Sequence, residues 1–242
     1  QGLQDYSYEL GFVRRNYGFD SNNYGRPVVV GTHRLGFNDQ FTGEFHVEML
    51  RNQQAVGLGG VLLSPGFGIF SGSLAMSNSG KGVGGLLNIG IQRQSRSFNF
   101  GADTQLASER FAKLGQHLKE LAPQQISNMF FSLPIKNYGS FTANYALQTF
   151  RQKSQNKILL ASYNKKVSKK GTLSASVKRF ISDKSSTAFH LNFNISLGNK
   201  TSASIRTSTQ SGREKASLGM SRGKSEGNGI GYRVFAGVGD SD

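Results

Sequence analysis

Large apolar and polar side chains alternate one by one along repeated stretches of about ten residues of this chain. In the first stretch Tyr6, Tyr8 and Leu10 occupy every second position, and Asp5 and Glu9 lie between them. At roughly 180° per residue, as in a strand, the aromatic side chains share one face, whereas at roughly 100° per residue they scatter around a helix. The pattern therefore predicts β-strands with one apolar and one polar face.

The alternation predicts fifteen strands in the 242 residues. About ten residues is the length that a tilted strand needs to cross a bilayer. The hydrophobic fraction is 36%, and no apolar run approaches the roughly 18 residues of a membrane helix. The predicted strands lie near residues 5–12, 27–35, 41–49, 54–63, 70–77, 83–93, 97–103, 126–135, 140–148, 157–167, 172–180, 189–197, 201–208, 215–221 and 228–238.

Short and long connections alternate between the predicted strands, as they do in outer-membrane barrels with tight periplasmic turns and longer external loops. Two connections depart from this order, the short 51–53 and the long 222–228. The predicted short connections are 36–39, 64–68, 93–97, 136–139, 168–171 and 198–200, and the predicted long ones are 15–26, 78–84, 107–125, 150–156, 181–186 and 209–214.

The longest connection, 107–125, has a helix-like spacing of Leu114, Leu118 and Leu121. We expect an ordered or partly helical external loop. The alternative is that this segment folds into the lumen.

The two faces predict an all-β fold, an antiparallel transmembrane β-barrel. Polar side chains are costly in hydrocarbon, so the aromatic rows should meet lipid. The other rows hold too many hydroxyls and amides for a dry core, so they should line a wet lumen. The predicted lumen-facing residues are Glu9, Arg34, Glu44, His46, Glu48, Lys178, His190, Asn192 and Arg206, and the predicted lipid-facing residues are Tyr6, Tyr8, Leu10, Phe12, Phe45, Phe100, Phe141, Tyr145, Phe189, Leu191 and Phe193.

Charged residues at positions that belong to the apolar face should lie at the depth of the lipid headgroups. Lys165 and Arg179 are two such residues, and both lie near predicted strand ends. Their side chains can reach the headgroup zone from there. An odd number of strands does not close a bacterial barrel, so we expect this wall to be part of a larger barrel.

The net charge of +15 suggests that the chain could bind nucleic acid. The Lys and Arg residues fall mostly in connections, and no RNA-binding strand motif or zinc spacing is present, so we expect no nucleic-acid partner. The chain has no Cys, which suits passage through an oxidising periplasm. It opens QGLQDYSYEL, without a signal peptide, so its start is expected to be internal to a longer polypeptide or trimmed.

No enzymatic constellation stands out, and we expect neither catalysis nor a cofactor. Glu44, His46 and Glu48 project from one strand face and could be read as metal ligands or acid–base groups. A solvated stripe in the lumen is the interpretation favoured here, because such a stripe needs His and Glu only for hydration and for contacts with whatever fills the pore. The GVGG run at 82–85 is not a phosphate loop, because no Lys-Ser/Thr follows it.

The segment GLQDYSYELGFVRRNYGFDSNNYGRPVVVGTHRLGFNDQFTGEFHVE (2–48) resembles the barrel of the outer-membrane fimbrial ushers, in which a G-x-x-D-Y-S strand follows the plug domain. An R-x-Y-G loop and a Y-G-x-P strand come next in that family. The opening segment is more similar to the archaic, Csu-type branch. Further similar segments are QAVGLGGVLL (54–63), IQRQSRSFNFGADTQLAS (91–108), FFSLPIKNYGSFTANYALQ (130–148) and GIGYRVFAG (229–237).

The resemblance implies a 24-stranded barrel, of which residues 1–242 supply roughly strands 7 to 21. It implies a plug domain in the lumen, and it implies periplasmic N-terminal and C-terminal domains, all absent from this sequence. The implied function is assembly and secretion of pilus subunits that a periplasmic chaperone delivers, in the bacterial outer membrane and without ATP. The implied partners are the chaperone, the subunits, the plug, outer-membrane lipid and lipopolysaccharide.

Two alternatives from other classes remain open at this point. A porin-like or autotransporter-like channel would share the strand pattern, although no constriction-loop signature is present. A soluble, basic all-β adhesin or nucleic-acid binder would share the composition.

Overall fold

The computed structural model describes residues 2–14, 18–114, 123–151, 155–198, 200–210, 212–224 and 230–239. It contains fifteen strands, so the predicted number is confirmed. The strands are β1 (Gln4–Arg14), β2 (Tyr24–Gly36), β3 (Phe41–Leu50), β4 (Gln53–Ser64), β5 (Gly68–Ser79), β6 (Gly82–Gln94), β7 (Asn99–Ala107), β8 (Gln125–Ile135), β9 (Gly139–Thr149), β10 (Asn156–Lys166), β11 (Gly171–Ile181), β12 (Ser186–Gly198), β13 (Thr201–Gln210), β14 (Arg213–Arg222) and β15 (Tyr232–Gly239).

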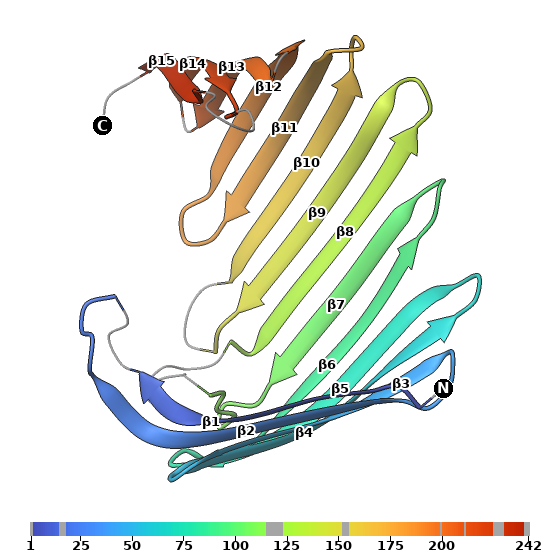
Figure 1. Ribbon diagram of the computed structural model, residues 1–242, viewed down its shortest axis with the longest axis vertical. Helices are drawn as coiled ribbons and strands as arrows, with labels where there is room; N and C mark the ends of the chain where they lie inside the picture. The colour runs from blue at the N-terminus through green and yellow to red at the C-terminus, as the bar shows by residue number, and fades with distance from the viewer. Residues whose placement is uncertain are drawn as a thin grey trace. The chain divides into compact units, whose positions relative to one another are not determined.

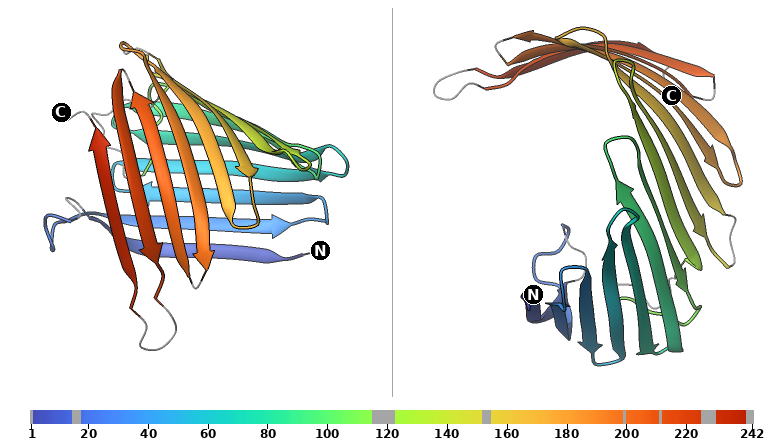
Figure 2. Two further views of the ribbon diagram at one scale, coloured as in Figure 1. Left: turned by 90° about the horizontal axis from the view of Figure 1, so that it is seen from above. Right: turned by 90° about the vertical axis from the view of Figure 1, so that its right-hand side faces the viewer.

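The strands form one antiparallel sheet in which the spatial order is the sequence order, β1 to β15 (Figure 1). Every connection is therefore a hairpin between neighbours, and both views of Figure 2 show the same succession of strands. The predicted all-β, antiparallel fold class is confirmed. In the described part of the chain, no helix is long and apolar enough to cross a membrane.

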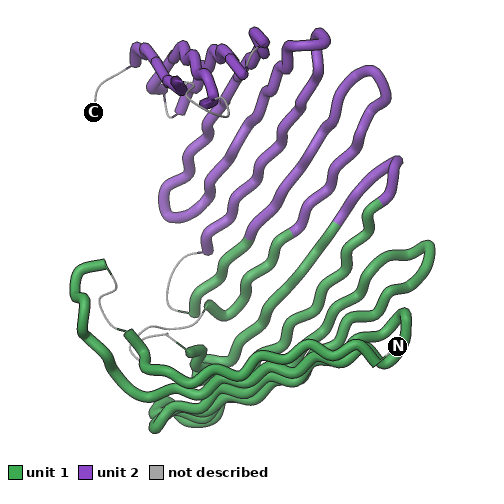
Figure 3. The backbone as a smooth tube through the Cα atoms, in the orientation of Figure 1, with its two compact units in different colours: residues 1–94, 101–128, 147–154 green, residues 95–100, 129–146, 155–242 purple. Residues whose placement is uncertain are grey.

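Two compact units divide the chain (Figure 3). Unit 1 comprises residues 1–94, 101–128 and 147–154, and unit 2 comprises residues 95–100, 129–146 and 155–242. Strands β1 to β6 thus lie in unit 1 and strands β10 to β15 in unit 2, while β7, β8 and β9 contribute residues to both.

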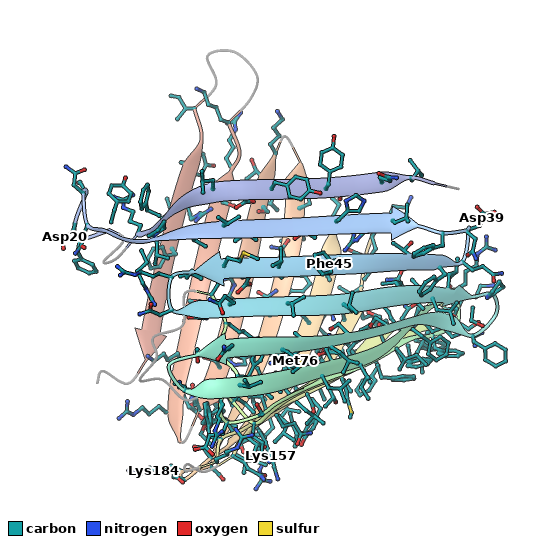
Figure 4. The ribbon with its side chains drawn as sticks, turned by 90° about the horizontal axis from the view of Figure 1, so that it is seen from below. Asp20, Asp39, Phe45, Met76, Lys157 and Lys184 are labelled. Carbon is teal, nitrogen blue, oxygen red and sulfur yellow. The ribbon has the colours of Figure 1, made fainter. Side chains whose placement is uncertain are left out.

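Successive connections leave opposite ends of the strands. Asp20, in the connection after β1, and Asp39, in the connection after β2, lie at opposite ends of unit 1 (Figure 4). In unit 2, Ser168 of the β10–β11 turn accepts the backbone N–H of Gly171 at 2.8 Å. Asn137 and Gly139 in the β8–β9 turn have φ of 66° and 111°, the left-handed region in which glycine pays no steric penalty.

The prediction that connection length alternates was wrong at three places. The connection expected to be long at 181–186 has four residues between Ile181 and Ser186, as many as the expected short connection between Lys166 and Gly171. The connections expected to be long at 78–84 and 209–214 are short, because β5 ends at Ser79 and β6 begins at Gly82, and because β13 ends at Gln210 and β14 begins at Arg213. The strands continue beyond the visible alternation, because backbone pairing persists where Ser, Gly and Asn replace the aromatic residues. Gly82 and Gly212, with φ of 91° and 83°, allow such tight reversals.

Little of the described chain is buried. The buried apolar side chains are Leu50, Ala107, Phe111, Ala112 and Ala188. By contrast, the rows of Phe, Leu, Tyr and Met that alternate along the strands are largely exposed. A soluble protein rarely leaves contiguous apolar surface of this extent uncovered, so these rows require an apolar environment.

Candidate functional site: the two faces of the sheet

The strand register gathers the aromatic residues of unit 1 on one face, called here its aromatic face. Tyr8 lies opposite Gly31, and Gly31 lies opposite Val47. On the next pair Phe45 lies opposite Leu58. Directly opposed residues of antiparallel strands share a face, so Tyr6, Tyr8, Leu10, Phe12 and Phe45 lie together. Leu10 is 83% exposed and Tyr8 is 69% exposed.

Unit 2 has an aromatic face built in the same way. Phe189 lies opposite Val177, Leu191 opposite Ala175, and Phe193 opposite Leu173. Tyr145 of β9 lines a shallow apolar hollow together with Leu159 and Val177. Phe141 shares the parity of Tyr145 along β9, and Phe100 stacks on Phe98 with ring centroids 6.2 Å apart.

Charged residues on the aromatic face of unit 2 lie near strand ends. Lys165 is the penultimate residue of β10, and its Nζ lies 5.8 Å from the centroid of the Tyr138 ring. Arg179 lies opposite Leu159 near the end of β11. Glu214 and Arg222 lie near the two ends of β14. The centre of this face is therefore apolar, with charges at its margins.

His33 is an exception that the sequence pattern missed. It lies opposite Tyr6 and Phe45, on the aromatic face of unit 1. Its Nδ1 lies 3.3 Å from the hydroxyl of Tyr8, and its ring stacks on Tyr6 with centroids 6.2 Å apart. The imidazole thus has a polar partner on an otherwise apolar surface, which lowers the cost of placing it there.

The opposite face of unit 1, called here its polar face, carries paired charges. Both Nε and Nη2 of Arg34 donate to Oε2 of Glu44, at 3.0 and 2.6 Å. The two side chains are 55% and 35% exposed, so water screens the pair and it stabilises the fold by no more than about 1 kcal/mol. Glu9 lies on the same face, opposite Val30.

A chain of polar contacts runs beside this pair. Thr32 Oγ1 lies 2.8 Å from His46 Nδ1, and His46 Nε2 lies 3.1 Å from Glu48 Oε1. The second carboxylate oxygen of Glu48 accepts the backbone N–H of Leu114 at 3.1 Å. Leu114 follows β7 in the chain, so a segment distant in sequence rests on this face.

That segment, residues 108–114, is called here the strap. Ser108 exchanges two hydrogen bonds with Gly85: its backbone N–H donates to the Gly85 carbonyl, and its Oγ accepts the Gly85 N–H, both at 2.8 Å. The backbone N–H of Ala112 donates to Ser77 Oγ at 2.9 Å. Phe111 and Ala112 are 4% and 2% exposed. The strap therefore lies on the polar face of β3, β5 and β6.

The strap decides between the two expectations for 107–125 as far as that segment is described. Residues 108–114 fold onto the polar face and contain no helix. Leu118 and Leu121, which carried the helical spacing, lie outside the described residues, as does His117. The length of the connection was the one feature of the sequence that indicated the strap. Ser77 and Glu48 could not be predicted as its partners, because they bind backbone N–H groups of the strap.

The polar face of unit 2 brings the remaining predicted lumen residues together. Lys178 lies opposite Ala188, and His190 lies opposite Ser208. Asn192 lies opposite Arg206, whose Nε donates to the Asn192 Oδ1 at 3.3 Å. Of the described residues, no three His, Asp or Glu side chains converge in a way that would hold a metal ion. The partner of Glu44 is Arg34, whereas His46 contacts Glu48.

Comparison with solved structures places this sheet among known folds. The chain shares its fold with the P pilus usher PapC. It matches a chain of the cryo-EM structure of an E. coli P pilus tip assembly intermediate, PapC–PapD–PapK–PapG, with a TM-score of 0.79 and 16% sequence identity over 98% of this chain. It also matches the structure of the PapC translocation pore, with a TM-score of 0.70 and 16% identity over 98% of this chain.

This chain covers 32% and 51% of the two PapC-containing matches, so it spans between a third and about half of those chains. No family model and no curated protein matches the sequence. The likeness to PapC is thus one of fold, in which this sheet corresponds to part of the usher β-barrel.

Proposed function

We propose that this chain forms part of the pore wall of a fimbrial usher in the bacterial outer membrane. The pore is a conduit through which folded pilus subunits leave the cell. The observation that carries the proposal is the separation of the two faces. The aromatic rows are exposed in both units, and a bilayer supplies the apolar environment that they need. The fold shared with the PapC translocation pore supports a role in protein passage.

The polar faces suit a wet lumen that holds a plug domain at rest. They carry hydroxyls, amides and ion pairs, such as Arg34 with Glu44, which a dry core would not accommodate. The pore wall serves as a conduit for folded subunits. It performs no covalent chemistry and needs no cofactor. Secretion proceeds without ATP, as the resemblance to ushers implies.

The partners follow from the same proposal. A periplasmic chaperone delivers subunits to domains outside residues 1–242, and the subunits pass along the polar faces. The aromatic faces contact lipid, and Lys and Arg in the longer, external loops contact anionic lipopolysaccharide. The motif run at 2–48 supports the archaic, Csu-type branch as the finer assignment.

Complementation tests the function. The whole gene is expressed with its chaperone and subunits in a strain that lacks its usher, and surface fimbriae are counted by electron microscopy. We expect fimbriae with the matching chaperone pair. Absence of fimbriae under every chaperone pairing would contradict the proposal.

Single-channel conductance separates the proposal from a porin. The whole protein in a planar bilayer should be closed for most of the time, because a plug occupies the lumen. A steadily open channel would favour a porin-type barrel. Recovery of the whole protein in the aqueous phase without detergent would contradict both membrane functions.

A further inference from the structure

The polar faces of the two units differ in charge. In unit 1 this face carries the carboxylates Asp5, Glu9, Glu44 and Glu48, together with Arg26 and with Arg34, which pairs with Glu44. In unit 2 the same kind of face carries Lys178, Arg206, Lys215 and Arg233. The overall charge of +15 hides this segregation.

Carboxylates are absent from the described polar face of β10 to β15. These strands hold one carboxylate, Glu214. Glu214 lies opposite Thr209, which lies opposite Phe189, so it belongs to the aromatic face. Lys178, Arg206, Lys215 and Arg233 therefore share the described polar face of these strands with no carboxylate.

Three of the four basic residues, Arg206, Lys215 and Arg233, line two hollows that share part of their lining. One hollow is lined by His190, Asn192, Arg206, Ser208, Lys215 and Ser217. The other is lined by Asn194, Ser202, Ser204, Arg206, Ser221 and Arg233. Arg206 borders both, as does Phe235, which is 78% exposed. The remaining lining includes several small residues, among them Ser204, Ser208, Ser217 and Gly237.

We infer that the polar face of β11 to β15 is a docking surface for an acidic patch on a folded protein. The inference rests on the proposed function, in which protein subunits pass this wall. Lys178, Arg206, Lys215 and Arg233 supply the complementary charge, and all four are exposed. Exposed ion pairs are individually weak and screened by salt, so such a surface orients a passing partner without holding it.

The chemistry of the face favours protein over nucleic acid. Single-stranded nucleic acid binds where aromatic side chains stack on successive bases. The aromatic residues on this face of β10 to β15 are Phe180 and Phe235, on β11 and β15. They do not form a row. Ser, Asn and Gly occupy the positions between, and they suit hydrogen bonding to a protein surface.

The test uses the whole protein in cells with its own chaperone and subunits. The variant K178Q/R206Q/K215Q/R233Q should reduce surface fimbriae about tenfold, because electrostatic complementarity acts mainly on encounter and orientation. The control K136Q/K169Q/K170Q/K200Q removes the same charge from short connections, at the opposite ends of the strands from the longer loops that the proposal places against lipopolysaccharide, and it should assemble normally. Heat-modifiable migration of the unboiled protein shows that each variant is folded, and the charge-keeping variant K178R/R206K/K215R/R233K should restore assembly.

A matched pair at one position separates charge from shape. Ser217 lies opposite Arg206 and Gly237 on this face. Ser217→Asp should reduce fimbriae, whereas Ser217→Lys should not. The inference is overturned if the four-Gln variant assembles fimbriae at the wild-type level. It is also overturned if the two Ser217 variants reduce the number of surface fimbriae equally. It is also overturned if the four-Gln change abolishes binding of single-stranded DNA and leaves assembly unchanged. If the wild-type protein assembles no fimbriae, the proposed function itself fails.

Discussion

Gly84 lies directly beneath the backbone of Phe111: a Cβ at position 84 would lie 2.1 Å from the Phe111 nitrogen. Gly84 pairs with Ser77, whose hydroxyl accepts the next backbone N–H of the strap. Close backbone approach of this kind is possible only at glycine. A glycine inside a strand usually weakens the strand. Gly84 instead provides the space in which the backbone of the strap packs on the sheet.

Gly84→Ala should displace the strap. The added methyl group cannot coexist with the Phe111 backbone, and overpacking of this kind costs about 1–3 kcal/mol. Hydrogen exchange measured by mass spectrometry on the whole protein should become faster in peptides that cover 108–114. The control is Gly85→Ala, because the atom nearest to a Cβ there is the Ala75 carbonyl oxygen at 3.9 Å. Equal exchange in the two variants would contradict the close contact.

Glu48→Ala should loosen the same strap from β3. The substitution removes the acceptor of the Leu114 N–H and the partner of His46, and a hydrogen bond to a charged group contributes about 1.5–3 kcal/mol. Exchange at Leu114 should rise by at least tenfold. Glu44→Ala on the same face breaks the exposed pair with Arg34 and should leave Leu114 unchanged. A rise in both variants would mean that general loss of charge is responsible.

Two substitutions on β12 should differ sharply in cost. Leu191→Arg places a charge on the aromatic face at mid-strand, where a bilayer would penalise it by about 2–4 kcal/mol. Asn194→Arg places the same charge on the polar face, where the directly opposite residues Thr172 and Ser204 are uncharged, and it should cost little. Urea unfolding of the whole protein in lipid vesicles measures both. Equal destabilisation by the two substitutions would mean that the faces do not meet different solvents.

The sequence was sufficient for the strands because one face is apolar throughout. Tyr6, Tyr8 and Leu10 show the two-residue period directly, and this period gives the face on which each residue of β1 lies. Strand ends were less predictable. Around 78–84 the alternation fades into Ser, Gly and Asn, so the two-residue turn at 80–81 carried no hydrophobic signal.

The contacts between distant segments could not be read from the pattern. His33 belongs to the aromatic face, and its place beside Tyr8 depends on register, since alternation marks the face but not the partner. The strap depends on backbone groups of Ala112 and Leu114, which have no side-chain signature. Similarly, the basic surface of unit 2 emerges only when Arg206, Lys215 and Arg233 are brought onto neighbouring strands.

The most direct test of the central claim is to ask what each side chain of β12 touches. The chain has no Cys, so single cysteines at positions 189 to 196 can carry a spin label in the whole protein, with any cysteine elsewhere replaced, reconstituted in vesicles. Labels at odd positions should collide with oxygen dissolved in the bilayer, and labels at even positions with a water-soluble nickel complex. A period of two, with the collisions alternating in phase with Phe189 and His190, is the predicted result. Labels at odd positions that meet neither reagent, or that meet only the nickel complex, would contradict it.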